Sequence, residues 1–99
     1  MVKFAIWATV QAKGGKEAEV EAFLKSAQRL AEAESKTVSW YAIRMGGGRY
    51  GIFDTFQDET GREAHLNGEI AKALMANAKE LLAADPRIEK IEILAAKGN

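Results

Sequence analysis

Cysteine is absent from this chain of 99 residues, which also has only one proline and one histidine. Without cysteine the chain makes no disulfide bond and has no thiolate chemistry, as is common in a reducing compartment. Its fourteen basic and fourteen acidic residues cancel, so it lacks the basic surface of a nucleic-acid-binding domain. No apolar run approaches the roughly 18 residues of a membrane span. We therefore expect a cytoplasmic protein with no nucleic-acid partner and no membrane partner.

The start of the chain is apolar over FAIWATV, after Lys3. This run is at the short limit for a signal peptide, and polar residues follow it at once, so we expect no leader. The composition, 47% hydrophobic and 28% charged, is typical of a globular chain, and the length predicts a single domain over residues 1–99. A domain of this size buries only about 60–65% of its unfolded surface, so a partner subunit would support its thin core.

Hydrophobic periodicity predicts strands and helices in alternation. The predicted strands span residues 3–12, 37–45, 49–57 and 87–95, and the predicted helices span 16–34, 58–67 and 69–83. Asp58 is expected to cap the short helix, the glycines 46–48 to form a hairpin turn with positive φ, and Gly68 to take a left-handed conformation. The order β-α-β-β-α-β predicts an α+β domain of the ferredoxin-like class, in which helices cover one face of an antiparallel four-stranded sheet.

The other face of this sheet is also apolar in the sequence. Phe4 and Ile6 alternate with Trp7 in the first strand, and the second and third strands continue that second face with Tyr41 and Phe53. A monomer would expose this surface, which favours a homodimer whose two sheets pack face to face. The alternative is a sheet face that stays partly exposed.

The motifs of common cofactor and metal sites do not fit here. Residues 46–51, GGGRYG, match G-x-G-x-x-G but lie between two strands, whereas a dinucleotide site places its glycines between a strand and a helix. One histidine leaves a metal only carboxylates, and His65 with Glu69 is just a pair. No Gly-x-Ser-x-Gly elbow is present. We therefore predict no metal and no nucleotide cofactor.

His65 is the one side chain whose ordinary pKa suits proton transfer near neutrality. One interpretation is a half-buried histidine that packs beside Leu66. The other is a base or hydrogen-bond donor in a pocket between the short helix and the sheet. Small neighbours such as Gly61 would let the short helix approach the sheet. Asp54 lies in a strand that disfavours aspartate, so it needs a partner. It is either an anchor bonded to backbone amides or to a cation such as Arg62, or a group that orients the pocket.

Four segments carry a family resemblance: FAIWATV, AKGGKEAEVEAFL, SWYAIR and, most specifically, IFDTFQDETGREAHLNGEIAKALM. The last holds an acid in the third strand, an aromatic residue two positions on, and an Ala-His pair in the short helix. Over residues 3–95 the chain resembles the antibiotic biosynthesis monooxygenase family, and within it the quinol-monooxygenase-like branch. The resemblance implies a homodimeric α/β barrel with a ligand pocket in each subunit, between the sheet and its own helices.

The resemblance also implies a chemistry. Well-studied relatives oxidise phenols or hydroquinones with O₂ and use no flavin, haem or metal. By position His65 would be the base or donor and Asp54 would orient it, while Trp7, Trp40 and Phe56 would form an aromatic wall for the substrate. Haem-degrading relatives place a tryptophan where this chain has His65 and a histidine ligand near Met75, so haem degradation is not expected.

Three functions remain open at this point. The first is cofactor-independent oxidation of a small quinol or polycyclic phenol. The second is a non-catalytic dimeric protein that binds or senses an aromatic metabolite. The third is a barrel whose pocket is filled by its own side chains. A cavity of about 300 Å³ or more beside His65 would favour the first two.

Overall fold

The computed structural model describes residues 2–98 and contains four strands and three helices in that range. The strands are β1 (Phe4–Gln11), β2 (Thr37–Gly46), β3 (Arg49–Phe56) and β4 (Arg87–Glu92), and the helices are α1 (Glu17–Ala33), α2 (Glu59–Leu66) and α3 (Glu69–Leu81). These bounds differ from the predicted ones by at most two residues, except that β4 ends three residues early.

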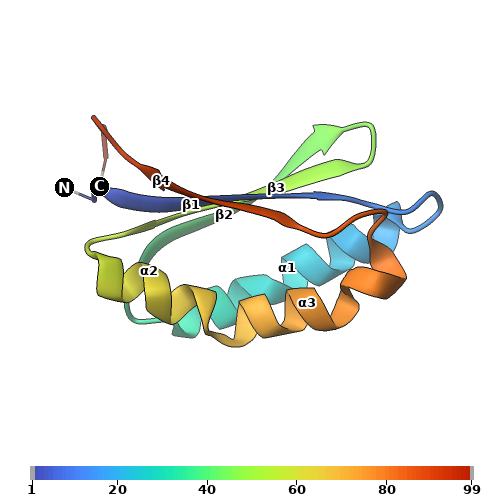
Figure 1. Ribbon diagram of the computed structural model, residues 1–99, viewed down its shortest axis with the longest axis horizontal. Helices are drawn as coiled ribbons and strands as arrows, with labels where there is room; N and C mark the ends of the chain where they lie inside the picture. Colours follow the sequence, from blue (N-terminus) through green and yellow to red (C-terminus); the bar gives the residue numbers. More distant parts are fainter. Residues whose placement is uncertain (1, 99) are drawn as a thin grey trace.

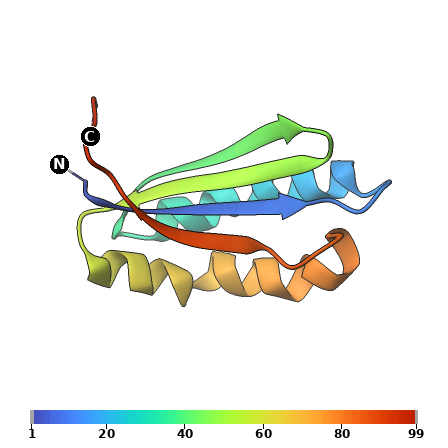
Figure 2. The ribbon, with the colours of Figure 1, turned by 45° about the horizontal axis from the view of Figure 1, so that its top comes forward.

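The strands form one sheet in the order β2-β3-β1-β4 (Figure 2). Each neighbouring pair is antiparallel. All three helices lie on the same side of the sheet, and the other side carries no helix (Figure 1). The predicted ferredoxin-like α+β arrangement is therefore confirmed.

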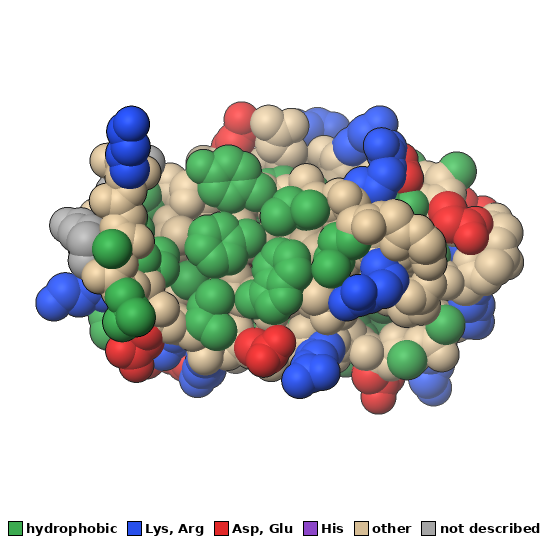
Figure 3. All heavy atoms as spheres, turned by 90° about the horizontal axis from the view of Figure 1, so that it is seen from above, with side chains coloured by type: hydrophobic (Ala, Val, Ile, Leu, Met, Phe, Trp, Pro, Cys, Tyr) green, Lys and Arg blue, Asp and Glu red, His purple; other side chains and the backbone are tan. Residues whose placement is uncertain are grey.

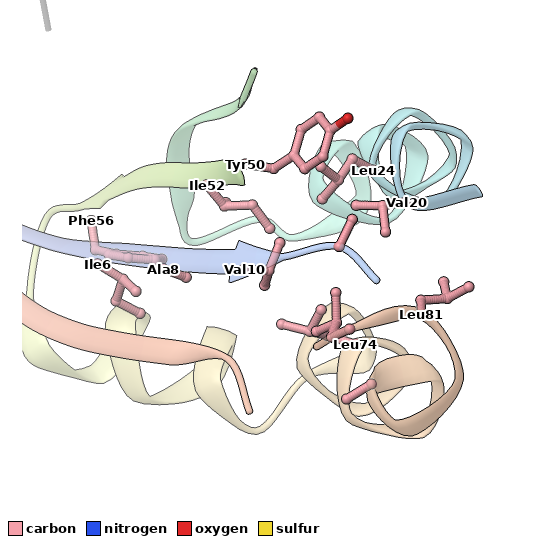
Figure 4. Packing of buried hydrophobic residues seen from close by; sticks show 13 residues of the cluster. Ile6, Ala8, Val10, Val20, Leu24, Tyr50, Ile52, Phe56, Leu74 and Leu81 are labelled. Atoms are coloured by element: carbon pink, nitrogen blue, oxygen red, sulfur yellow. The ribbon is translucent and has the colours of Figure 1, made fainter. Parts of the chain in front are cut away.

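The main core lies between the sheet and the two longer helices (Figure 4). Alternation along β1 turns Ile6, Ala8 and Val10 toward the helices, where each is buried. They meet a stripe of similarly buried residues from the helices, namely Val20, Leu24, Leu74 and Leu81. Burying one such aliphatic side chain stabilises the fold by roughly 1.5–3 kcal/mol. This core fixes how the helices lie on the sheet.

The helix-free side of the sheet is apolar, as the sequence predicted. A continuous patch of hydrophobic side chains covers this face (Figure 3). Tyr41 is 56% exposed and Ile43 is 37% exposed. The indole of Trp7 covers Gly51, where an added Cβ would come within 2.4 Å of the ring. A single copy of the chain therefore leaves a large apolar surface without a cover.

Three local predictions about chain ends and turns have different outcomes. The side chain of Asp58 accepts a hydrogen bond from the Gly61 amide at 2.8 Å, so the predicted cap of α2 is confirmed. The hairpin glycines 46–48 all have positive φ, as predicted. Gly68 does not, because its φ is −92° and it precedes α3. Close packing explains this glycine instead, since an added Cβ would lie 3.2 Å from the Ala64 carbonyl oxygen.

Among residues 2–98, the helices are too short or too polar for any of them to cross a membrane.

Candidate functional site

His65 lies between two carboxylates that come from different elements. Its Nδ1 atom is 2.7 Å from Oε1 of Glu34, at the end of α1, and its Nε2 atom is 2.9 Å from Oδ2 of Asp54, on β3. The histidine side chain is only 8% exposed. Both ring nitrogens therefore face acceptors that belong to the protein.

Local structure brings α2 close to the end of α1. Gly61, one turn before His65, packs against the segment after α1, where an added Cβ would lie 3.2 Å from the Lys36 carbonyl oxygen. Glu34 is the C-cap residue of α1, and Thr37 donates a hydrogen bond to its Oε1 at 2.7 Å. Gly61 thus lets α2 approach the segment between α1 and β2, and α2 also contacts the sheet, as expected.

Asp54 is fully buried and faces the helices from β3. Its two oxygens accept no hydrogen bond of regular geometry from residues 2–98, so the contact with His65 is a close ion pair with poor alignment. Arg62 is not its partner, and that alternative is wrong. The Arg62 guanidinium instead donates to Glu59 and to the carbonyl oxygens of Ala5 and Ile91.

The two carboxylates decide the protonation of His65. Burial alone lowers the pKa of a histidine, but the hydrogen bonds and charges of Asp54 and Glu34 outweigh it and raise the pKa of His65 to about 9. Burial raises the pKa of Asp54, and the neighbouring His65 opposes that shift. At neutral pH His65 is therefore an imidazolium, which donates from Nδ1 to Glu34 and forms an ion pair through Nε2 with Asp54. Of the two predicted roles, this geometry favours the donor over the base.

A groove of about 480 Å³ opens beside this pair. It lies between the end of α1, the segment that follows it, α2 and the start of α3. Its lining residues are Leu30, Ala33, Glu34, Ser35, Lys36, Thr37, Gly61, Ala64, His65, Gly68 and Glu69. The volume falls in the range of small-molecule sites, which start at about 300 Å³.

The expected pocket between the sheet and the long helices is filled instead. The cavity there, beside Val10, Leu24 and Leu74, holds only about 10 Å³. The space available to a ligand near His65 is the groove beside the short helix, which the first residue of β2, Thr37, also lines.

The three aromatic residues predicted to bind substrate do not form one wall. Trp7 lies on the helix-free face, on the opposite side of the sheet from His65. Phe56 is fully buried behind the imidazole, with the two ring centroids 5.4 Å apart. Trp40 lines a neighbouring groove of about 380 Å³, which shares Glu34 and Thr37 with the groove at His65. Of the three, Phe56 supports His65 from behind and Trp40 lies nearest to open space.

Metal ligands do not gather at this site. Across residues 2–98, no set of three histidine, cysteine, aspartate or glutamate side chains has the geometry to hold a metal ion. The pair of carboxylates on His65 therefore orients and charges the imidazole, and the site offers a ligand hydrogen bonds and an ionic partner.

Solved structures place this fold in a known class. A protein of Nitrosomonas europaea provisionally classed as an antibiotic biosynthesis monooxygenase superposes with a TM-score of 0.83 at 9% identity, covering 97% of this chain and 94% of its own. A similarly classed protein of Caulobacter crescentus gives 0.80 at 20% identity, with 95% and 92% covered. The chain thus has the fold of the antibiotic biosynthesis monooxygenases, and at this identity the likeness extends to the fold alone.

A second Nitrosomonas europaea protein, NE2512, is much more similar. It is 54% identical to this chain, with a TM-score of 0.96 and coverage of 100% of this chain and 96% of that one. The chain therefore belongs to the family of NE2512, a protein of unknown function. No family model matches the sequence, and no curated protein matches it.

Proposed function

We propose that this chain is a cofactor-independent monooxygenase of the quinol-monooxygenase-like branch, which oxidises a small quinol or polycyclic phenol with O₂. The observation that carries the proposal is His65, held between Asp54 and Glu34 on the wall of a groove of about 480 Å³. One solved structure of the same fold, from Bacteroides thetaiotaomicron, is described as a possible oxidoreductase, at 14% identity. That description supports the class of reaction and leaves the substrate to experiment.

The proposed reaction inserts one oxygen atom of O₂ into the ring and releases the other as water. The Glu34 carboxylate beside His65 would accept the phenolic proton, which leaves an electron-rich anion. This anion would transfer one electron to O₂, and the proton would return to the reduced oxygen. The two radicals combine into a hydroperoxide, and this loses water to give the quinone. The groove would hold the ring in one orientation and exclude water, while the charged His65 and its carboxylates would bind the hydroxyl group.

The substrate must approach His65 from the side of Glu34. The Glu34 side chain is 21% exposed, whereas that of Asp54 is 1% exposed. A ligand can therefore reach or displace the Glu34 contact, while the Asp54 contact stays inside the protein and holds the ring in place. Asp54 thus holds the His65 ring in place, and the side of the ring that contacts Glu34 is the one a ligand can reach.

The proposed assembly is a homodimer that joins the helix-free faces of two sheets. The support is the apolar patch on that face, with Tyr41 at 56% and Ile43 at 37% exposure in one copy (Figure 3). Soluble monomers rarely leave a patch of this kind uncovered. A second copy presents the same patch, so a two-fold contact would cover both at once.

A second candidate is a non-catalytic dimer that binds or senses an aromatic metabolite in the same groove. It is favoured by the pKa of about 9 at His65. An imidazolium with both nitrogens paired makes a stable binding contact, whereas a general base must be unprotonated at working pH. Turnover separates the two candidates.

The test is O₂ consumption with a panel of hydroquinones and without NADPH, after subtraction of the reaction without protein. We expect the wild type to consume O₂ with at least one compound and His65→Gln to lose about 10²- to 10⁴-fold in rate, the usual contribution of a group that takes part in proton transfer. Glu19→Gln, at an exposed position of α1, is the matched control and should keep the wild-type rate. No consumption with any compound favours the binding protein. An unchanged rate in His65→Gln removes that residue from the reaction.

A further inference from the structure

Glu34 is the acidic residue on the wall of the groove that also contacts His65. We propose that Glu34 recognises the ligand, by accepting a hydrogen bond from a hydroxyl group on an aromatic ring. This inference rests on the proposed function, in that it takes the groove at His65 to be a ligand site. It assigns the direct contact to Glu34 and makes His65 the residue that positions it.

The two oxygens of Glu34 have different surroundings. Oε1 faces the Nδ1 atom of His65 at 2.7 Å and accepts from Thr37 Oγ1, also at 2.7 Å. Oε2 accepts no hydrogen bond from the part of the chain that the structure describes. It lies against Gly68, where an added Cβ would come within 3.2 Å of it. Since Gly68 lines the groove, the unpaired oxygen lies at the groove wall.

His65, Asp54 and Thr37 together fix the Glu34 side chain in place and leave its Oε2 atom without a hydrogen bond. His65 is held from behind by Asp54 and donates to Oε1, while Thr37 donates to the same atom. These contacts limit the rotation of the carboxylate, so Oε2 is presented to the groove with little loss of side-chain entropy on binding. A carboxylate oxygen only accepts, and a hydrogen bond to it is about twice as strong as one between neutral groups.

The rest of the groove suits a flat ring. Leu30, Ala33 and Ala64 give it apolar walls. A bicyclic aromatic compound fits within about 480 Å³. Lys36 and Glu69 at the rim have opposite charges, so the groove has no excess of one sign to favour a charged ring. The ligand class that meets both features is an aromatic alcohol.

The experiment compares two probes that differ in one donor: 2-naphthol and its methyl ether, 2-methoxynaphthalene. Dissociation constants are measured by isothermal titration at neutral pH. We expect the wild type to bind 2-naphthol at least tenfold more tightly than the ether. In Glu34→Gln this ratio should fall to about twofold or less, with affinity for the ether unchanged. Glu19→Gln, the same substitution at an exposed position of α1 outside the groove, is the matched control and should keep the full preference.

A second measurement needs no variant and therefore holds even if Glu34→Gln fails to fold. The carboxyl carbon of Glu34 in ¹³C-labelled wild type should shift on titration with 2-naphthol and stay in place with the ether. If both probes bind equally, or if Glu34→Gln keeps the preference, the recognition by Glu34 is overturned and the groove remains a ligand site. If neither probe binds the wild type, the groove itself fails as an aromatic site, and the proposed function fails with it.

Discussion

The Nε2 atom of His65 lies 2.9 Å from Oδ2 of Asp54, in a place where the histidine is 8% exposed and the aspartate 1%. Removing two charges from water is costly, and an apolar pair of similar size often gives a fold of equal or greater stability. A buried pair beside a groove is therefore evidence of a role beyond stability. This pair leads us to predict how pH and substitution change the stability of the fold and the pKa of His65.

The first prediction concerns the dependence of stability on pH. The pKa of His65 is about 9 in the folded chain and about 6.5 in the unfolded chain. Its contribution is fully present below pH about 6.5 and is lost as the pH rises toward about 9. The free energy of unfolding should therefore fall by about 1.4 kcal/mol for each pH unit in this window, on the order of 3 kcal/mol in all.

Urea denaturation at steps from pH about 6 to about 10 measures this fall. His65→Gln is the control, because it keeps every other titrating group and should show a much flatter profile across the same window. Profiles that run parallel in the two proteins would show that His65 has an ordinary pKa and is not held by the carboxylates.

The second prediction concerns Asp54→Asn, which removes the charge and keeps the shape. Without the buried carboxylate, the pKa of His65 should fall from about 9 toward its ordinary 6.5. The chain has one histidine, so a proton NMR titration follows a single imidazole. Stability at neutral pH should fall by roughly 1–3 kcal/mol, because a buried polar contact is lost. Asp85→Asn, at an exposed position, should change neither quantity; an unaltered titration in Asp54→Asn would assign the shift to Glu34 alone.

Much of the fold was predictable because its signals are local. Alternation separated the two faces of β1, the helical period identified the buried stripe of α1, and Asp58 and the glycines 46–48 marked a cap and a turn. Each depends on residues within a few positions of one another.

The contacts of the site were harder to predict because they cross the chain. Glu34 is one of fourteen acidic residues and lies 31 positions from His65, so no local pattern distinguishes it from its exposed neighbours. Arg62 was a candidate cation for Asp54 in the sequence, yet it donates to carbonyl oxygens of β1 and β4 instead. Trp7 is an aromatic residue of the kind that lines substrate pockets, but it lies on the opposite face of the sheet from His65. These cases depend on contacts between residues far apart in the sequence, such as that of His65 on α2 with Glu34 after α1.

The third prediction concerns Arg62, whose side chain is 7% exposed. Its Nη1 atom donates to the carbonyl oxygens of Ala5 and Ile91, at 3.3 and 3.0 Å, and its guanidinium lies 5.0 Å from the centre of the Phe4 ring. Lysine keeps the charge but cannot reproduce this fork, so Arg62→Lys should destabilise the fold by roughly 2–3 kcal/mol in urea denaturation. Arg87→Lys, at a side chain 76% exposed, should stay within about 0.5 kcal/mol. Equal stabilities in the two variants would contradict the anchoring role of Arg62.

The last prediction concerns the two faces of the sheet and uses one substitution on each. Ile43, 37% exposed, lies on the helix-free face, while Ile88, 43% exposed, pairs with Ala8 and lies on the helix side. If two copies join through the helix-free face, Ile43→Glu buries charge in the contact and should give a monomer, whereas Ile88→Glu should keep the wild-type mass. Light scattering at micromolar concentration gives the mass of the wild type, of Ile43→Glu and of Ile88→Glu. A wild type with the mass of one chain would remove the dimer, and dissociation by Ile88→Glu alone would move the contact to the β4 edge.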